Sequence, residues 1–453
     1  MKVNINNLGV IKNVTFDLDK KLSLLCGSNN SGKTYLSYII YALSRNMSFG
    51  NLKFEKYPKL TVNTSDVIVL DIYKLEEVIE LSFKSVISSL DSIYGISKEQ
   101  VNHIFDKTDF KAIYTIGELE NKIYALSVSE ELDLKGVKYR FTKEESTFDV
   151  QVEMLTSDED GTSEIVNYLL LYNIYKYFAF YPIKGAFISP VERNSIYTFS
   201  KELSISRNNI IDQLQKGGDL DPFELLFNST NRYPLAISDG LKVSNDLVNL
   251  QKQQSKFYQL AESIEVDLLN GSLTLTDKGE YIFISNKSKS KKLPIHMSAS
   301  IVKTLSSLVF YLKHFAEDGD LIIIDEPEMN LHPDAQIELT HLFVKLMRYG
   351  FRLLISTHSD YIIREFNNLI MLNRIEDKLQ GEIEKLGYDI DDKIDPNDVA
   401  CYFFRFKNSK SKNVIVESLK IDNNGVAIPT IDETIEHQNS MYEELLYLGS
   451  ENS

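Results

Sequence analysis

Cysteine is scarce in this chain: Cys26 and Cys401 are the only two among 453 residues. Two cysteines so far apart in sequence do not indicate a disulfide framework, and they fit a reducing compartment, so we expect a cytoplasmic protein. A long apolar run is also missing. The most apolar stretch, residues 165–180, is interrupted by two asparagines and a lysine, whereas a bilayer-spanning helix needs about 20 predominantly apolar residues. We expect no membrane span and no signal peptide.

Basic side chains are fewer than acidic ones, with 49 Lys and Arg against 65 Asp and Glu, which gives a net charge of −16. This surplus disfavours a protein whose whole surface attracts phosphate backbones, but it leaves room for a local basic groove that binds DNA. The other proportions, 43% hydrophobic and 25% charged residues, are those of an ordinary globular protein. At roughly 150 residues per domain, the length indicates more than one packing unit.

A glycine-rich turn near the N-terminus carries the most specific motif. Residues 27–34 read GSNNSGKT and match G-x-x-x-x-G-K-[ST] in full, between an apolar stretch at 22–26 and an amphipathic helical pattern at 34–45. In such a loop the glycines let the backbone wrap the β-phosphate, the lysine reaches the β- and γ-phosphates, and the threonine hydroxyl is a ligand for Mg²⁺. A chance match in an ordinary Gly-Lys turn is the alternative. The predicted ATP-binding residues are Gly27, Asn29, Asn30, Ser31, Gly32, Lys33 and Thr34, and Thr34 is also a predicted metal ligand.

A second motif lies far down the chain. Residues 321–324 are consecutively apolar and are followed by Asp325, Glu326, Pro327 and Glu328, which predicts a buried parallel strand ending in carboxylates. At the carboxyl end of such a strand Asp325 can hold Mg²⁺ through water, and Glu326 is placed to polarise an attacking water as the general base. For Glu328 we expect the simpler role of an acidic residue near the start of the next helix.

A third apolar strand is predicted at 352–357, and it is followed by His358. If this strand is parallel to the other two, its polar end reaches the same edge of the sheet. There a histidine can hydrogen-bond the γ-phosphate and hold the attacking water. A lone histidine after a strand is usually structural, so the functional interpretation depends on its order after the two earlier motifs.

Together, the three motifs resemble the head of ABC-type ATPases. The variant found here, with GSNNSGKT, DEPEMNLHP and STHSDYI, is similar to stand-alone ATPases of the OLD (overcoming lysogenisation defect) type and to SMC-like repair ATPases, with specific motifs in residues 1–45 and 295–370. The resemblance implies an α/β ABC-ATPase head with a mixed sheet and a P-loop core, a helical second lobe inserted between Walker A and the signature and Walker B region, and a small α/β C-terminal tail. It also implies ATP and Mg²⁺ as cofactors. The residues that bind them and hydrolyse ATP would be Lys33, Thr34, Asp325, Glu326 and His358.

The same resemblance implies a second copy of the chain, because heads of this type complete each nucleotide site with residues of a partner head. Residues 330–334 match the D-loop that faces the second protomer, which assigns Asn330 and Asp334 to the site. The usual Ser-Gly-Gly core of the signature loop is absent. At the matching place Ser300 is the candidate, with Ser298 as the less favoured alternative, because a serine there can present a hydroxyl beside the free N–H groups of a helix start. An ordinary helix cap is the other interpretation of Ser300.

The glutamine loop of the family is not identifiable, and by position Glu192 or Arg193 would occupy that region. In the intervening chain the patterns predict a strand at 67–73 and helices at 74–92, 98–106 and 117–131. We expect four segments: an ATPase lobe with the P-loop and inserted elements at 1–195, a helical lobe with the signature-like helix at 196–315, the rest of the ATPase core at 316–375, and an α/β tail at 376–453.

Three functions from different classes fit these features. In the first, ATP binding and dimerisation regulate a separately encoded nuclease or toxin, as the resemblance to anti-phage ATPases such as AriA of PARIS and PtuA of Septu implies. No metal-dependent nuclease domain is evident after residue 376, where the acidic residues 389–392 fit a solvated turn. The second is a DNA-binding repair ATPase, although no segment fits the long coiled coil of that class. The third, a transporter subunit, normally has an intact signature motif. The first is our prediction.

Overall fold

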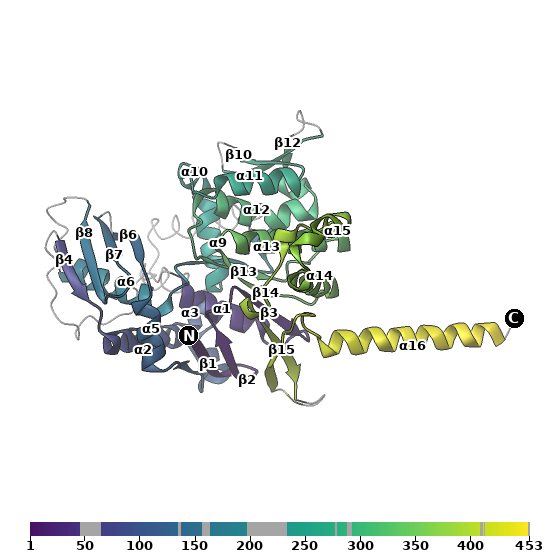
Figure 1. The fold of residues 1–453 in the computed structure, drawn as a ribbon, viewed down its shortest axis with the longest axis horizontal. Coiled ribbons are helices and arrows are strands. Elements are labelled where there is room, and N and C mark those ends of the chain that lie inside the picture. The colour runs from purple at the N-terminus through teal and green to yellow at the C-terminus, as the bar shows by residue number, and fades with distance from the viewer. Residues whose placement is uncertain are drawn as a thin grey trace, which may run out of the picture.

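The fold is built around one large mixed β-sheet (Figure 1). A computed structural model describes residues 1–45, 65–134, 137–155, 164–196, 233–276, 279–287, 292–407, 411 and 413–451. Residues 197–232, part of the segment expected to be mainly helical, lie outside the described residues. In the sheet, nine strands follow the order β5-β1-β2-β16-β15-β3-β14-β13-β9. Their bounds are β1 Lys2–Leu8, β2 Ile11–Asp17, β3 Leu22–Gly27, β5 Asp109–Ile113, β9 Ala186–Ser189, β13 Leu321–Asp325, β14 Arg352–Ser356, β15 Val399–Phe406 and β16 Val414–Leu419.

The centre of this sheet is parallel. Strand β3 pairs in parallel with β14 on one side and β15 on the other, and β13 pairs in parallel with β14 and β9. The antiparallel pairs β1–β2, β1–β5 and β15–β16 lie toward one edge. The expected α/β fold with a mixed sheet is therefore confirmed.

Both faces of the central strands are buried, which explains why their sequences are continuously apolar rather than alternating. In β13, Leu321 and Ile323 pack into one hydrophobic core, and Ile322 and Ile324 pack into a second core on the opposite face. Helices cover both faces. Their bounds are α1 Lys33–Ser44, α2 Ile72–Ser88, α3 Leu90–Tyr94, α4 Lys98–Ile104, α5 Ile116–Tyr124, α6 Glu164–Phe180, α9 Leu235–Asn245, α10 Leu247–Leu250, α11 Tyr258–Asp267, α12 Ser300–His314, α13 Pro333–Arg348, α14 Asp360–Met371, α15 Gln380–Lys385 and α16 Pro429–Glu451.

Two smaller antiparallel sheets flank the large one (Figure 1). The four-stranded sheet has the order β4-β8-β7-β6, and the three-stranded sheet has the order β10-β11-β12. The bounds of their strands are β4 Ser65–Val69, β6 Val128–Leu134, β7 Val137–Lys143, β8 Asp149–Met154, β10 Gly271–Leu275, β11 Tyr281–Ser285 and β12 Lys292–Pro294.

None of the helices among the described residues is both long and apolar enough to cross a membrane.

Three sequence expectations differ from the structure. The strand expected at 67–73 ends at Val69, because the side chain of Asp71 accepts a hydrogen bond from Tyr73 N–H and so starts α2. The helix expected at 117–131 ends at Tyr124, and the last part of that range belongs to β6. Residues 376–453, expected as a small tail, contribute β15 and β16 to the central sheet. The four domain bounds otherwise stay predictions.

The close packing of β15 against β3 depends on Gly27, the first residue of the GSNNSGKT loop. Gly27 has φ +129°, in the region that side chains rarely adopt. A Cβ atom built on it would lie 2.0 Å from the carbonyl oxygen of Phe404 on β15. Glycine is therefore required here both for its backbone conformation and for the approach of the neighbouring strand.

We predict that Gly27→Ala lowers the free energy of unfolding by about 3 kcal/mol or more, because it combines backbone strain with a clash against main-chain atoms. Gly350→Ala is the matched control. Gly350 also has a positive φ of +90°, but a Cβ atom there meets nothing within 4 Å, so its cost should be only about 1 kcal/mol. Urea unfolding of both variants measures the difference. Equal losses would show that the contact with Phe404 carries no cost.

Candidate nucleotide-binding site

The three sequence motifs meet at one edge of the central sheet. The P-loop follows β3, Asp325 ends β13, and His358 follows β14 by two residues. These strands are neighbours in the order β3-β14-β13 and run parallel. Because parallel strands end at the same edge, the side chains that follow them converge there.

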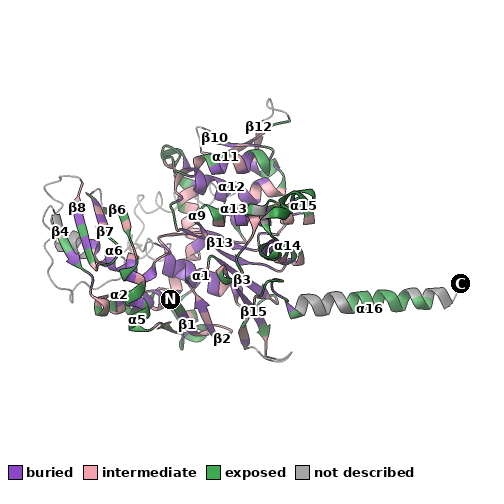
Figure 2. Ribbon diagram, in the orientation of Figure 1, coloured by how far each residue is buried: buried purple, intermediate pink, exposed green. Residues whose placement is uncertain are grey.

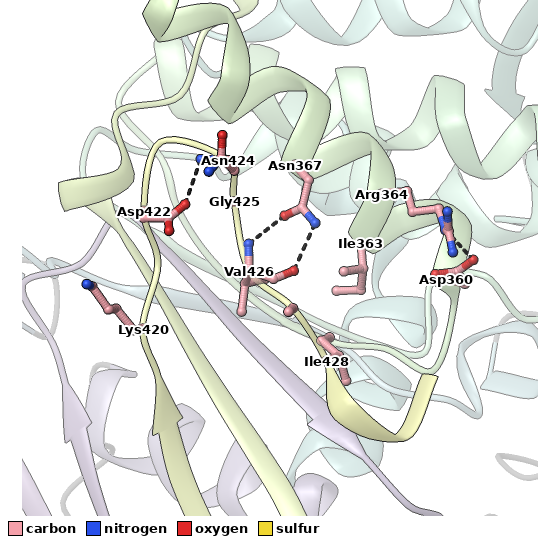
Figure 3. A pocket seen from close by; sticks show the side chains of 11 residues that line it. Asp360, Ile363, Arg364, Asn367, Lys420, Asp422, Asn424, Gly425, Val426 and Ile428 are labelled. Atoms are coloured by element: carbon pink, nitrogen blue, oxygen red, sulfur yellow. Dashed lines mark hydrogen bonds and ion pairs between the residues drawn. The ribbon is translucent and has the colours of Figure 1, made fainter. Parts of the chain in front are cut away.

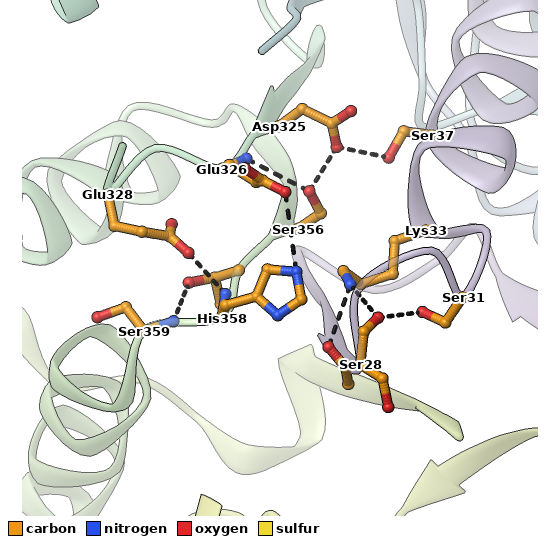
Figure 4. Close-up of polar contacts among 12 residues, drawn as sticks. Ser28, Ser31, Lys33, Ser37, Asp325, Glu326, Glu328, Ser356, His358 and Ser359 are labelled. Carbon is orange, nitrogen blue, oxygen red and sulfur yellow. Dashed lines mark hydrogen bonds and ion pairs between the residues drawn. The ribbon is translucent and has the colours of Figure 1, made fainter. Parts of the chain in front are cut away.

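A cavity of about 820 Å³ opens at this edge. It is a size that suits a small-molecule ligand. Residues from the P-loop, from the turn after β13 and from the end of β14 surround it, as the labelled side chains in Figure 4 show. Its lining residues are Val10, Asn29, Asn30, Ser31, Gly32, Lys33, Thr34, Tyr35, Glu326, Glu328, Met329 and His358.

The P-loop presents positive charge to this cavity. Lys33 is buried, and its ammonium donates hydrogen bonds to the carbonyl oxygens of Gly27, at 3.1 Å, and Ser28, at 2.9 Å. Burial lowers the pKa of Lys33, and the Glu326 carboxylate opposes this shift. Helix α1 begins after Gly32 and has no side-chain cap, so its first N–H groups are free to bind an anion.

The carboxylate of Asp325 is fully buried at the base of the site. Its Oδ1 atom accepts hydrogen bonds from the hydroxyls of Ser37, at 3.3 Å, and Ser356. Its Oδ2 atom is buried and has no hydrogen-bond partner. Burial raises the pKa of Asp325, and the hydroxyls of Ser356, Thr34 and Ser37 oppose this shift.

These residues fit a magnesium ion. Mg²⁺ prefers oxygen ligands and keeps several waters and phosphate oxygens besides one or two protein groups. The unpartnered Oδ2 of Asp325 and the hydroxyl of Thr34 supply such oxygens. Within the described ranges, no group of three or more His, Cys, Asp or Glu side chains could hold a metal alone, so an ion here would need the nucleotide and water as further ligands.

Glu326 lies at a bend where the chain leaves β13. Its φ of +46° is in the left-handed region, which costs a non-glycine residue about 1–2 kcal/mol. Its N–H donates to the carbonyl oxygen of Ser356, at 3.0 Å. The bend turns the Glu326 side chain into the cavity, where its carboxylate lies 3.7 Å from Nε2 of His358.

Arg193 holds this bend from the buried side. Its side chain is 1% exposed, and its guanidinium donates to the carbonyl oxygens of Asp325 and Glu326, each at 2.7 Å, and of Pro190, at 3.0 Å. Burial lowers the pKa of Arg193, and the charge of Asp325 opposes the shift. The sequence offered this residue only as a candidate for the glutamine-loop region. The structure places it under the Asp-Glu turn instead, outside the cavity lining.

His358 is fixed by Glu328. The backbone N–H of His358 donates to Oε1 of Glu328, at 2.6 Å. Burial, together with the charge of Lys33, lowers the pKa of His358 to about 4, so the imidazole is neutral at physiological pH. The expectation that Glu328 lies at the start of the next helix was wrong, because His332 is the N-cap of α13. The sequence signal for its real position is Pro327, which turns the chain back.

The residues expected to act on a second copy lie outside the cavity of one chain. Ser300 is the first residue of α12, which has no side-chain cap, so its N–H groups are open to an anion. Asn330 has φ +63°, and Asp334 lies in the first turn of α13 with its side chain 85% exposed. Their roles in a partner's site stay predictions.

The cavity, the P-loop and the carboxylates that face it define a nucleotide-binding site of the P-loop class. The chain belongs to the family described as the AAA ATPase domain, whose model matches residues 1–363. A search of curated proteins finds no match.

Among solved structures, the chain is similar to heads of SMC proteins at low identity. One is an SMC head bound to the C-terminal winged-helix domain of ScpA, with 13% identity, TM-score 0.37 and coverage of 93% of this chain and 97% of the other. The SMC head domain from Thermotoga maritima shows 7% identity and TM-score 0.33, with coverage of 93% and 98%. An SMC head with an extended coiled coil, bound to a ScpA domain from Pyrococcus furiosus, shows 13% identity and TM-score 0.36, with coverage of 97% and 98%.

We predict that Arg193→Lys lowers kcat for ATP hydrolysis by about tenfold or more and changes the Kd for ATP little, because a lysine cannot bind the two carbonyls as a planar fork. Arg352→Lys is the matched control. Arg352 donates to the carbonyls of Asp19 and Lys20, each at 2.7 Å, at the opposite end of β14. Steady-state kinetics and binding of a fluorescent ATP analogue measure both constants. A kcat for Arg193→Lys equal to that of the control would contradict a role in positioning Glu326.

Proposed function

We propose that this protein is an ATP-binding and ATP-hydrolysing switch that regulates a separately encoded effector, a nuclease or a toxin, in bacterial anti-phage defence. The observation that carries the ATPase part is the cavity that gathers Lys33, Glu326 and His358 from three distant segments. The defence role rests on the motif resemblance. Two copies form the smallest active unit in this proposal, each completing the other's site.

The chain's own residues divide the work. The free N–H groups at the start of α1 and the ammonium of Lys33 bind the phosphates, while Thr34 and Asp325 would hold Mg²⁺. Bound Mg²⁺ supplies charge neutralisation of the phosphate oxygens. Glu326 accepts a proton from the attacking water, and the neutral imidazole of His358 orients that water or the γ-phosphate. Ser300, Asn330 and Asp334 of a second copy would close the site from the other side.

The acidic residues Asp391 and Asp392 contact side chains of α13. Asp392 accepts a hydrogen bond from Arg348, at 3.3 Å, and lies 3.4 Å from a ring nitrogen of His341. Asp391 also pairs with Arg348, at 3.1 Å. These contacts use the two carboxylates to fasten the chain to α13, which favours a structural role over metal-dependent nuclease chemistry.

We predict that Glu326→Gln keeps ATP affinity but lowers kcat by about a hundredfold or more, because the amide cannot accept the proton. This variant should accumulate ATP-bound dimers in sedimentation velocity runs. Lys33→Ala is the companion variant, and it should lose ATP affinity itself. A Glu326→Gln protein that hydrolyses ATP at the wild-type rate would overturn the assignment of the base.

A further prediction concerns the effector. The Glu326→Gln protein, isolated from its native host with ATP, should retain a nuclease or toxin encoded next to its own gene, and Lys33→Ala should not retain it, because only the ATP-bound state presents the regulatory surface. Mass spectrometry identifies the retained protein, and titration calorimetry with the purified pair measures the ATP dependence. Binding of DNA instead of a protein, measured by fluorescence anisotropy, would support the repair alternative, and retention of a membrane protein would support transport.

A further inference from the structure

The nucleotide cavity has a part that the phosphates do not explain. Lys33, Glu326 and His358 supply the charged and polar groups, but the lining also includes Val10 and Tyr35. A triphosphate is a chain of charged oxygens, and it gains nothing from an isopropyl group or from the face of an aromatic ring. A nucleobase is planar and has an apolar face that packs well on such a ring. The volume of about 820 Å³ leaves room for a whole nucleotide.

Tyr35 is partly exposed on a helix that is otherwise buried. Every residue of α1 is buried except Thr34 and Tyr35, and Figure 2 shows α1 coloured mostly as buried. Both of these residues line the cavity. The open surface of the Tyr35 ring therefore belongs to the cavity. A planar ligand that covered this surface would remove apolar area from water on both sides of the contact.

The ring of Tyr35 is held in place by two other aromatic rings. Tyr94 and Phe105 stack on each other, with centroids 4.7 Å apart and an interplanar angle of 9°. The Tyr35 ring packs nearly at right angles to both, at 5.3 Å from Tyr94 and 5.6 Å from Phe105. The hydroxyl of Tyr94 also donates to the carbonyl oxygen of Tyr35, at 3.0 Å. A ring fixed in this way loses little conformational freedom when a ligand binds.

The turn between β1 and β2 packs against the same ring. Gly9 has φ +57°, and a Cβ atom on it would lie 2.9 Å from Cε2 of Tyr35 and 3.2 Å from the Phe105 ring. Only glycine lets the turn come this close. The next residue, Val10, lies beside the P-loop, because a Cβ atom on Gly32 would be 3.2 Å from its Cγ2 atom. Val10 and Tyr35 thus belong to the same part of the cavity, next to the start of α1.

We propose that Tyr35 and Val10 form the subsite for the nucleobase, with the Tyr35 ring as the surface on which the base packs. This inference rests on the proposed function, in which the P-loop binds the phosphates. Every base has an aromatic face, so the ring selects a nucleotide over free triphosphate without reading the polar edge of the base. The motif G-x-x-x-x-G-K-[ST] ends at Thr34, so it gives no information about this residue.

The test compares Tyr35→Leu with a matched control, Tyr38→Leu. Tyr38 lies one turn further along α1, and its ring also stacks with Tyr94, at 6.5 Å, but it is buried and outside the cavity lining. Titration calorimetry with Mg²⁺ measures the Kd for a non-hydrolysable ATP analogue and for inorganic tripolyphosphate. Tyr35→Leu should weaken binding of the analogue by about tenfold and leave that of tripolyphosphate unchanged. Tyr38→Leu should change neither Kd.

A second variant and a spectroscopic measurement report on the ring itself. Tyr35→Phe keeps the ring and loses the hydroxyl, so it should bind the analogue as tightly as wild type. The triphosphate of 2-aminopurine riboside loses fluorescence when its base stacks on an aromatic ring, and the chain contains no tryptophan that would interfere. Binding to wild type should quench this probe. Saturating Tyr35→Leu protein should leave most of its fluorescence.

Three outcomes would overturn the subsite. They are unchanged analogue binding by Tyr35→Leu, an equal loss of tripolyphosphate binding, which would show that the ring only supports the P-loop, and a Tyr35→Phe variant as weak as Tyr35→Leu, which would assign the contact to the hydroxyl. Failure of the proposed function gives a different result. In that case Lys33→Ala would bind the analogue as tightly as wild type, while probe fluorescence with the two Tyr35 variants would still report on the base.

Discussion

The site depends on the parallel pairing of three strands. Backbone hydrogen bonds between β3, β14 and β13 fix where each strand ends relative to its neighbours. These strand ends set the positions of the P-loop, His358 and Asp325. A slip of one residue in any strand would turn every side chain of that strand to the other face. Both faces are already committed to separate hydrophobic cores, so such a slip is strongly disfavoured.

Burial explains the chemistry of this edge. The carboxylate of Asp325 is removed from water and left with one unsatisfied oxygen, which is costly unless a cation completes it. The positive charge of Arg193 lies near this carboxylate on the buried side of the turn and compensates its negative charge. The same guanidinium binds the carbonyl oxygens of Asp325 and Glu326. The strain of Glu326 at positive φ is thus held by hydrogen bonds to Arg193 and Ser356. The positive φ of Glu326 costs conformational energy, and in this conformation its carboxylate faces the cavity.

The C-terminal region links this edge to the outside of the molecule. Strand β15 lies beside the P-loop strand, and its Phe404 carbonyl approaches Gly27 so closely that only glycine fits. The chain then turns back to α14, where Asn367 fastens it, and leaves the body as α16. Helix α14 therefore both starts just after His358 and holds the segment that leads into α16 (Figure 3).

The sequence by itself determined the three motifs, their strand or loop settings and the identity of Lys33, Asp325, Glu326 and His358 at one site, because apolar runs and glycine turns are local signals. Only the tertiary structure decided what Arg193 and Glu328 contact, and that β15 and β16 complete the central sheet. Those features depend on contacts that leave no pattern in the local sequence: Arg193 binds residues more than a hundred positions away, Glu328 binds His358 across 30 positions, and β15 pairs with β3.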